Sequence, residues 1–224
     1  MLIIIILLVA LVFALEYFSR GSIWWFSEII FFRRQPQTIV LTFDDGPDPR
    51  YTTEIIEILK KYQISATFFV CGKESAQHPE IIEALLAAGH EIGNHGWNHL
   101  NMIFKSPTKI RREIVETDNL LRDLGVSGKI HFRPPFTRMF LLTPIIAAKL
   151  HKKIFLWNIP SKDFKARSVA EIVENVLKKS KQGGIIVMHD GRGDRQKSVE
   201  ALRLIIPELL KREFIFQTCS QYLD

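Results

Sequence analysis

The sequence has little cysteine: Cys71 and Cys219 are the two thiols among 224 residues, and they lie far apart in the chain. Two distant thiols form neither a disulfide framework nor the paired spacing of a zinc ribbon. Cys71 ends an apolar run and is predicted to be a small buried side chain. The sequence leaves open whether the two cysteines pair.

Blocks of charge are also absent. The net charge is +6, and the Lys and Arg residues are spread through helix-like segments without interleaved aromatic residues. This distribution favours solvated helix faces and argues against nucleic-acid binding. No G-x-G-x-x-G follows a strand-like run, and the sequence shows no internal repeat and no sign of a protein partner. A hydrophobic content of 47% suits one domain with a sizeable core.

The first fifteen residues are all apolar and uncharged. A helix of that length rises about 22 Å, against about 30 Å for a hydrocarbon core. A second apolar stretch, 23–32, carries Trp24 and Trp25, a residue type favoured at membrane interfaces. A cleaved signal peptide would have a basic residue before its apolar run and a small-x-small cleavage site after it. This sequence has neither feature. We therefore predict a membrane anchor and interfacial segment over 1–34, followed by a folded domain over 35–224.

The charges near this segment bear on the side of the membrane. Arg20, Arg33 and Arg34 follow the apolar run, and no Lys or Arg precedes it. The positive-inside tendency then favours a cytoplasmic domain, although whole domains also translocate despite their charge.

From residue 38 onward, short β-rich runs alternate with helical patterns. The predicted strands are 38–43, 66–71, 90–93, 129–132, 153–157, 184–190 and 213–218, and the predicted helices are 52–62, 79–89, 106–125, 143–151, 168–180 and 195–212. Pro207 is expected to distort the last helix. The alternation predicts a parallel α/β fold, with a barrel as the first candidate and a doubly wound sheet as the alternative.

Polar side chains gather where these strands end. In a parallel α/β barrel the carboxyl ends of the strands share one rim, and that rim carries the chemistry. Five predicted strands end on or run towards such groups: Asp44-Asp45, Asn94-His95, Arg133, Asp163 and His189-Asp190.

His95 and His99 are four residues apart, which places two imidazoles on one face of a helical turn. With Asp45 they form a two-His, one-Asp ligand set. That set suits zinc with an open position, or a non-haem iron triad. Asp44 is then free to take a proton from water, and His189 to protonate a leaving group.

Five motifs in order carry a family resemblance: TFDDGP (42–47), HGWNH (95–99), RPPF (133–136), SKDF (161–164) and IIVMHD (185–190). The chain resembles the polysaccharide deacetylases of the NodB homology type, carbohydrate esterase family 4. The resemblance implies a distorted (β/α) barrel that hydrolyses N-acetyl groups of amino sugars in a glycan such as peptidoglycan or a chitin-like polysaccharide.

The resemblance also implies roles for single residues. Asp45, His95 and His99 would bind a divalent metal, usually Zn²⁺, with Co²⁺, Mn²⁺ or Ni²⁺ as alternatives. Asp44 would be the general base and His189 the general acid.

The remaining motif residues would support these groups. Arg133 would orient Asp44, and Asp163 would pair with His189. The residues assigned to the substrate and the oxyanion are Phe136, whose backbone N–H would hold the oxyanion, Pro135, Phe164 and Val187. Phe164 stands where the family commonly has Trp, and Val187 where it has Leu, so the acyl pocket departs from the usual pattern.

Two other functions fit the same residues. One is a deacylase or deformylase of a lipid-linked amino sugar, which would suit a membrane-anchored chain. The other is a non-catalytic glycan-binding relative, although such proteins usually lose metal ligands or the base. By family resemblance the anchored domain is expected outside the cytoplasm, whereas the Arg residues favour the cytoplasmic side.

Overall fold

The computed structural model describes residues 29–30 and 35–224. The predicted anchor over 1–34 therefore lies, apart from Ile29 and Ile30, outside the described residues. Among the described residues, no helix has the length and apolar character needed to cross a bilayer.

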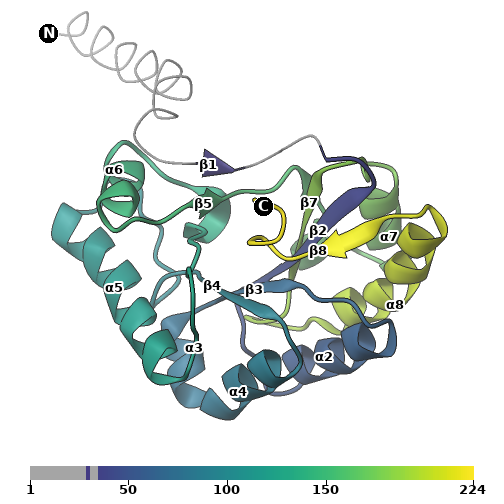
Figure 1. The fold of residues 1–224 in the computed structure, drawn as a ribbon, viewed down its shortest axis with the longest axis horizontal. Coiled ribbons are helices and arrows are strands. Elements are labelled where there is room, and N and C mark those ends of the chain that lie inside the picture. The colour runs from purple at the N-terminus through teal and green to yellow at the C-terminus, as the bar shows by residue number, and fades with distance from the viewer. Residues whose placement is uncertain (1–28, 31–34) are drawn as a thin grey trace, which may run out of the picture.

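A parallel sheet forms the centre of the domain (Figure 1). Its strand order is β4-β3-β2-β7-β6, and β8 adds a second pairing to β2. The strands are β2 (Thr38–Asp44), β3 (Thr67–Val70), β4 (Glu91–Asn94), β6 (Ile159–Pro160), β7 (Gly184–His189) and β8 (Ile215–Gln217). Every one of these pairings is parallel, which confirms the predicted α/β class.

The sheet continues beyond β4 through one residue. Phe132 bridges Asn94 on one side and Ile154 on the other. Ile154 opens β5 (Ile154–Phe155), which pairs with β1 (Ile29–Ile30). The recorded pairings among the described residues join β5 to β1 and Phe132 but not to β6, so the expected barrel is open between β5 and β6.

Helices pack around the sheet, as Figure 1 shows. They are α2 (Tyr51–Lys61), α3 (Gly72–Gln77), α4 (Pro79–Ala87), α5 (Pro107–Asp123), α6 (Leu142–Lys149), α7 (Val169–Leu177) and α8 (Gln196–Lys211), with 3₁₀ turns η2 (Pro135–Thr137) and η3 (Asp163–Lys165). The start of α5 follows from its sequence: the Ser106 hydroxyl accepts the Lys109 N–H at 3.3 Å, and Pro107 lacks the N–H that would go unpaired there.

Several predicted elements differ from the structure. The strand expected over 129–132 reduces to the bridge at Phe132, and the strand over 153–157 reduces to Ile154–Phe155. The helix α3 was not predicted. The helix α8 continues through Pro207, which lies on its exposed side.

The burial of β2 sets up the functional site. All seven of its residues are buried, and its side chains alternate between two apolar clusters, with Leu41 and Phe43 in one and Val40 in the other. This packing fixes the strand on both faces and holds its carboxyl end, at Asp44, in one place. Cys71 and Cys219 are both buried and free, as expected for Cys71.

Candidate active site

The strand ends meet at a cleft of about 490 Å³. Both carboxylates after β2 and both histidines of the HGWNH motif line it, together with His189 from the end of β7. The other lining residues are Phe136, Thr137, Arg138, Trp157, Pro160, Lys162, Phe164, Lys165 and Val187. The predicted convergence of the strand ends on one rim is therefore seen in the structure.

Asp45, His95 and His99 form a compact cluster in this cleft. Nε2 of His99 lies 3.0 Å from Oδ1 of Asp45, and Nε2 of His95 lies 3.4 Å from the same oxygen. One ligand atom from each of the three residues lies within 4.8 Å of the others. Asp45 and His95 are buried, and His99 is only slightly exposed.

The chemistry of this cluster fits a cation. The backbone carbonyl of Arg133 lies 2.7 Å from Nδ1 of His95, and because a carbonyl only accepts, this contact requires a proton on Nδ1. In the neutral ring Nε2 then carries a lone pair that faces the Asp45 carboxylate. Two acceptors so close together favour a cation between them, and the outer hydrogen bond is the support typical of a metal-ligating histidine.

Asp45 is held as a carboxylate. Burial alone would raise the pKa of Asp45, but with the imidazoles protonated, hydrogen bonds from His95 and His99 and the charges of His95 and His189 hold it well below its ordinary value. Its backbone is in the left-handed region, with φ of 79°, an uncommon conformation for a non-glycine residue. Such strain is typical of functional sites, where the surrounding structure fixes a side chain's direction.

Asp44 has a different partner. Its Oδ1 accepts a 2.6 Å hydrogen bond from the guanidinium of Arg133, which is fully buried. The same guanidinium donates to the hydroxyl of Thr42 at 2.7 Å and lies 4.0 Å from the ring centre of Phe69. Arg133 is thus fixed from several sides and in turn fixes the direction of Asp44.

His189 lies at the end of β7, with Asp163 beside it. Nδ1 of His189 donates to Oδ1 of Asp163 at 2.7 Å, which leaves Nε2 as the ring nitrogen available to the cleft. Burial lowers the pKa of His189, but the hydrogen bond and charge of Asp163, with the charges of Asp44 and Asp45, raise it overall to about 9. The imidazole is thereby held in its protonated form, as a proton donor requires.

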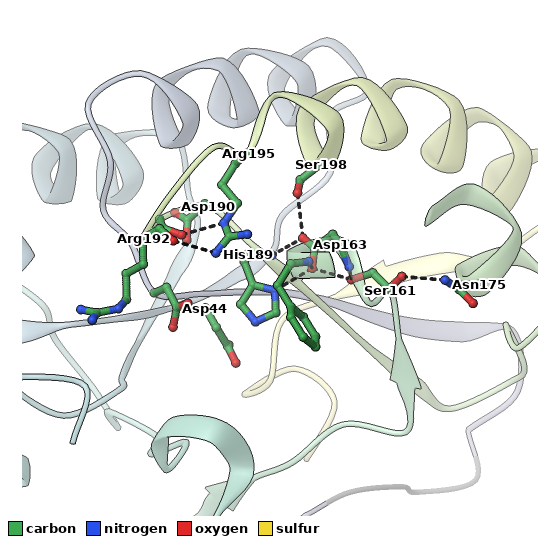
Figure 2. Close-up of polar contacts among 12 residues, drawn as sticks. Asp44, Ser161, Asp163, Asn175, His189, Asp190, Arg192, Arg195 and Ser198 are labelled. Atoms are coloured by element: carbon green, nitrogen blue, oxygen red, sulfur yellow. Dashed lines mark hydrogen bonds and ion pairs between the residues drawn. The ribbon is translucent and has the colours of Figure 1, made fainter. Parts of the chain in front are cut away.

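Asp163 is itself held by residues that the sequence did not single out. Figure 2 shows it between His189 and Ser198, whose hydroxyl donates to Oδ2 at 2.8 Å. The Ser161 hydroxyl donates to Oδ1 at 2.9 Å. Ser161 belongs to the SKDF motif, but Ser198 lies in α8, 35 residues away, and no sequence pattern marks it.

Asp190 braces the loop that carries Asp45. It is fully buried, accepts the Gly46 N–H at 3.1 Å, and accepts the Thr52 hydroxyl at 2.6 Å. Burial and the charges of Asp45 and Asp44 raise the pKa of Asp190 to about 7, against the opposing hydrogen bond from Thr52. The sequence marks Asp190 only as part of a strand-end pair and does not predict its role in the loop.

The predicted substrate residues divide into two groups. Phe136, Phe164 and Val187 line the cleft, whereas Pro135 is buried and does not line it. Pro135, which the resemblance assigns with them to the substrate and the oxyanion, has its ring near Gly96 of the HGWNH motif. Trp157 was missed, although it ends a predicted strand, and its indole donates to the Thr137 hydroxyl at 2.8 Å.

Comparisons with known proteins agree with this geometry. Residues 33–154 match the family described as polysaccharide deacetylase. A peptidoglycan-N-acetylglucosamine deacetylase of Bacillus cereus is 35% identical over 187 residues, covering 83% of this chain and 87% of the relative. A chitooligosaccharide deacetylase of Azorhizobium caulinodans is 29% identical, covering 80% of this chain and 91% of the relative.

The fold has a close counterpart among solved structures. A crystal structure of the peptidoglycan N-acetylglucosamine deacetylase Bc1960 superposes with a TM-score of 0.83 at 31% sequence identity. The superposition covers 87% of this chain and 91% of that one.

Proposed function

We propose that this chain, which belongs to the polysaccharide deacetylase family, is a metal-dependent hydrolase that removes N-acetyl groups from the amino sugars of a glycan. The observation that carries the proposal is the division of the two adjacent carboxylates. Asp45 lies against two imidazoles in a metal-competent cluster, while Asp44 is held by Arg133 at 2.6 Å and comes no nearer to His95 than 4.0 Å from its Nε2.

Asp45, His95 and His99 would hold a divalent metal, with Zn²⁺ as the first candidate and Co²⁺, Mn²⁺ or Ni²⁺ as alternatives. When bound, such an ion supplies Lewis-acid polarisation of the amide carbonyl and of a water molecule.

The chain's own groups move the protons. Asp44 accepts a proton from the water that attacks the amide carbon, and Arg133 keeps the carboxylate aimed at that water. His189 gives the proton on Nε2 to the amine nitrogen as the C–N bond breaks, and Asp163 stabilises the imidazolium before that transfer. The products are acetate and a free amino sugar.

Residues around the cleft are suited to hold a sugar and an acyl group. Phe136 is 57% exposed and contacts His99 edge-on, with the ring centres 4.5 Å apart. Phe164 is also exposed and lies edge-on to His189. These two aromatic faces flank the proposed reacting groups and are available for stacking on a sugar ring, while Val187 lies at the floor near β6. The Phe136 N–H remains our proposal for the oxyanion donor.

The named substrates of the relatives, peptidoglycan and chitooligosaccharides, support a polymeric or oligomeric glycan. A second candidate is a lipid-linked amino sugar, which the apolar sequence before residue 16 favours. Family resemblance supports an anchored protein whose domain lies outside the cytoplasm, where peptidoglycan is found.

Acetate release is the direct test. The metal-loaded full chain is incubated with N-acetylated peptidoglycan, with a chitooligosaccharide and with a polyprenyl-linked N-acetylated amino sugar in detergent. We expect acetate from a glycan, with the preferred substrate showing the highest kcat/KM. Absence of acyl release from all three would overturn the proposed function, and release from the lipid-linked sugar alone would establish the second candidate.

A further inference from the structure

An exposed apolar patch lies next to the cleft and has no role in the chemistry above. It consists of Phe104, Phe140, Leu141, Leu142 and Ile145. Phe104 is 80% exposed, Leu142 39% and Ile145 37%, and the Phe104 and Phe140 rings lie 5.6 Å apart. Four of these residues, without Ile145, line a pocket of about 490 Å³ at the start of α5 and α6. Gathered apolar side chains of this kind on a surface indicate a binding face.

The chain segments that form this patch lack acidic residues, whereas the later turns of α5 carry Glu113, Glu116, Asp118 and Asp123. Residues 92–112 and 124–162 contain neither Asp nor Glu, while the first stretch holds four Lys or Arg and the second holds seven. Some of these cations are already paired, such as Arg133 with Asp44 and Lys152 with Asp118. Others border the patch: Lys105 lines its pocket, Arg138 lies two residues before Phe140, and Lys149 lies one helical turn after Ile145.

The start of the described chain lies beside the same face. In β1, Ile29 packs against the apolar cluster that contains Ile146 of α6 and Met102, while Met139 packs there as well. Figure 1 shows β1 running next to β5 and α6. The described chain therefore begins, at Ile29, close to the patch, and the first fifteen residues of the sequence are apolar.

From these observations we propose that the patch docks the domain on a bilayer of anionic phospholipids. Exposed Phe and Leu side chains insert into the boundary between headgroups and acyl chains, while Lys and Arg around them contact anionic headgroups. The exposed aliphatic side chains of Leu142 and Ile145 favour a bilayer over an anionic glycan, because a glycan has no acyl chains for them to insert between. The anchor predicted over 1–34 would add a second attachment, since the described chain begins at Ile29 beside this face.

Docking in this way has a consequence for the substrate. Arg138 lines the catalytic cleft, and only Met139 separates it from Phe140 of the patch. The mouth of the cleft would then open close to the membrane surface, so glycan near the bilayer would reach it first.

The test measures contact with lipid at single positions of the full chain in vesicles. Both native cysteines are buried, so a fluorescent thiol label goes to a Cys introduced by Phe104→Cys or, as a matched control, by Leu204→Cys. Leu204 is 56% exposed on α8, which Figure 1 shows at the opposite end of the molecule from α6. In vesicles of phosphatidylglycerol and phosphatidylcholine, we expect doxyl-lipid quenching at position 104 to exceed that at 204 about twofold or more.

The second part of the test changes the charge of Lys residues that border the patch. The double change Lys105→Glu and Lys149→Glu in the Phe104→Cys chain should lower the quenching, while Lys60→Glu and Lys211→Glu on α2 and α8 should not. Equal quenching at 104 and 204 would overturn the proposal. A label at 104 that is shielded from water but unquenched by doxyl lipid would also overturn it and would indicate a second copy of the chain. Quenching is measured without acetate release. A negative quenching result would therefore reject membrane docking and leave the proposed deacetylase function untouched.

Discussion

At the scale of single residues, the site depends on giving chemically identical side chains different partners. Asp44 and Asp45 are neighbours in sequence, yet one contacts a buried guanidinium and the other contacts two imidazoles. The carboxylate pair and the H-x-x-x-H spacing were readable from the sequence because both motifs are local. The hydroxyl groups of Thr42 and Ser198 were not, since their partners Arg133 and Asp163 lie 91 and 35 residues away.

The pairing of His189 with Asp163 leads to a prediction on pH dependence. Asp163 raises the pKa of His189, so Asp163→Asn should lower that pKa. A lower pKa means that the imidazole loses its proton at lower pH, and a proton donor is active only in its protonated form. We expect the alkaline limb of the kcat profile to move to lower pH, with kcat reduced about tenfold or more at pH 8. The measurement is acetate release between pH 6 and pH 10.

Ser198→Ala is the matched control for this change. It removes one hydrogen bond from the same carboxylate and leaves the charge in place. Its alkaline limb should stay close to that of the unmodified chain. An Asp163→Asn profile that is lowered evenly at every pH would contradict the assignment of His189 as the proton donor.

At the scale of elements, the site depends on two neighbouring parallel strands that end together. Asp44 of β2 is in register with His189 of β7, and the Asp190 N–H donates to the Asp44 carbonyl at 3.1 Å. The loops that follow them are packed backbone to backbone, with Gly191 directly against the Asp45 carbonyl. Both buried strands were predicted well because a continuous apolar run is a strong local signal.

Less regular elements were predicted less well, for a physical reason. In the run 129–132, Ile130 and Phe132 are buried as a strand would require, but only Phe132 makes ladder contacts. The side-chain pattern reports burial, while a strand also needs a partner strand over several residues. Sequence alone does not specify that partner.

The close approach of the two loops predicts the effect of one added methyl group. A Cβ at Gly191 would overlap the Asp45 carbonyl carbon and oxygen, which belong to rigid backbone. Gly191→Ala should therefore displace Asp45 and lower metal affinity about tenfold or more, with a matching loss of activity. Calorimetric titration of the metal-free chain with Zn²⁺ measures the affinity.

Arg192→Ala, in the same loop, serves as the comparison. Its side chain is exposed and faces Glu74 rather than the metal ligands, so its Zn²⁺ affinity should match the unmodified chain. A Gly191→Ala chain with unchanged affinity would show that the loop packing does not position Asp45.

At the scale of the whole molecule, the alternation of strands and helices was sufficient to predict a parallel α/β domain with its chemistry at one rim. The gap between β5 and β6 was not predictable, because it depends on how far each short strand extends its pairing. The cluster of basic residues around the apolar patch was not predicted from the sequence either. The net charge of +6 is modest for the chain, and the patch is recognised only when the fold brings its segments together.

The central claim is that Asp45 holds the metal and Asp44 moves the proton. Two single variants, Asp44→Asn and Asp45→Asn, test it when metal content and acetate release are measured on the same preparations. Asp44→Asn should retain about one metal ion per chain while its kcat falls about a hundredfold or more, and Asp45→Asn should lose both. An Asp44→Asn chain that keeps full activity, or an Asp45→Asn chain that keeps its metal, would contradict the account.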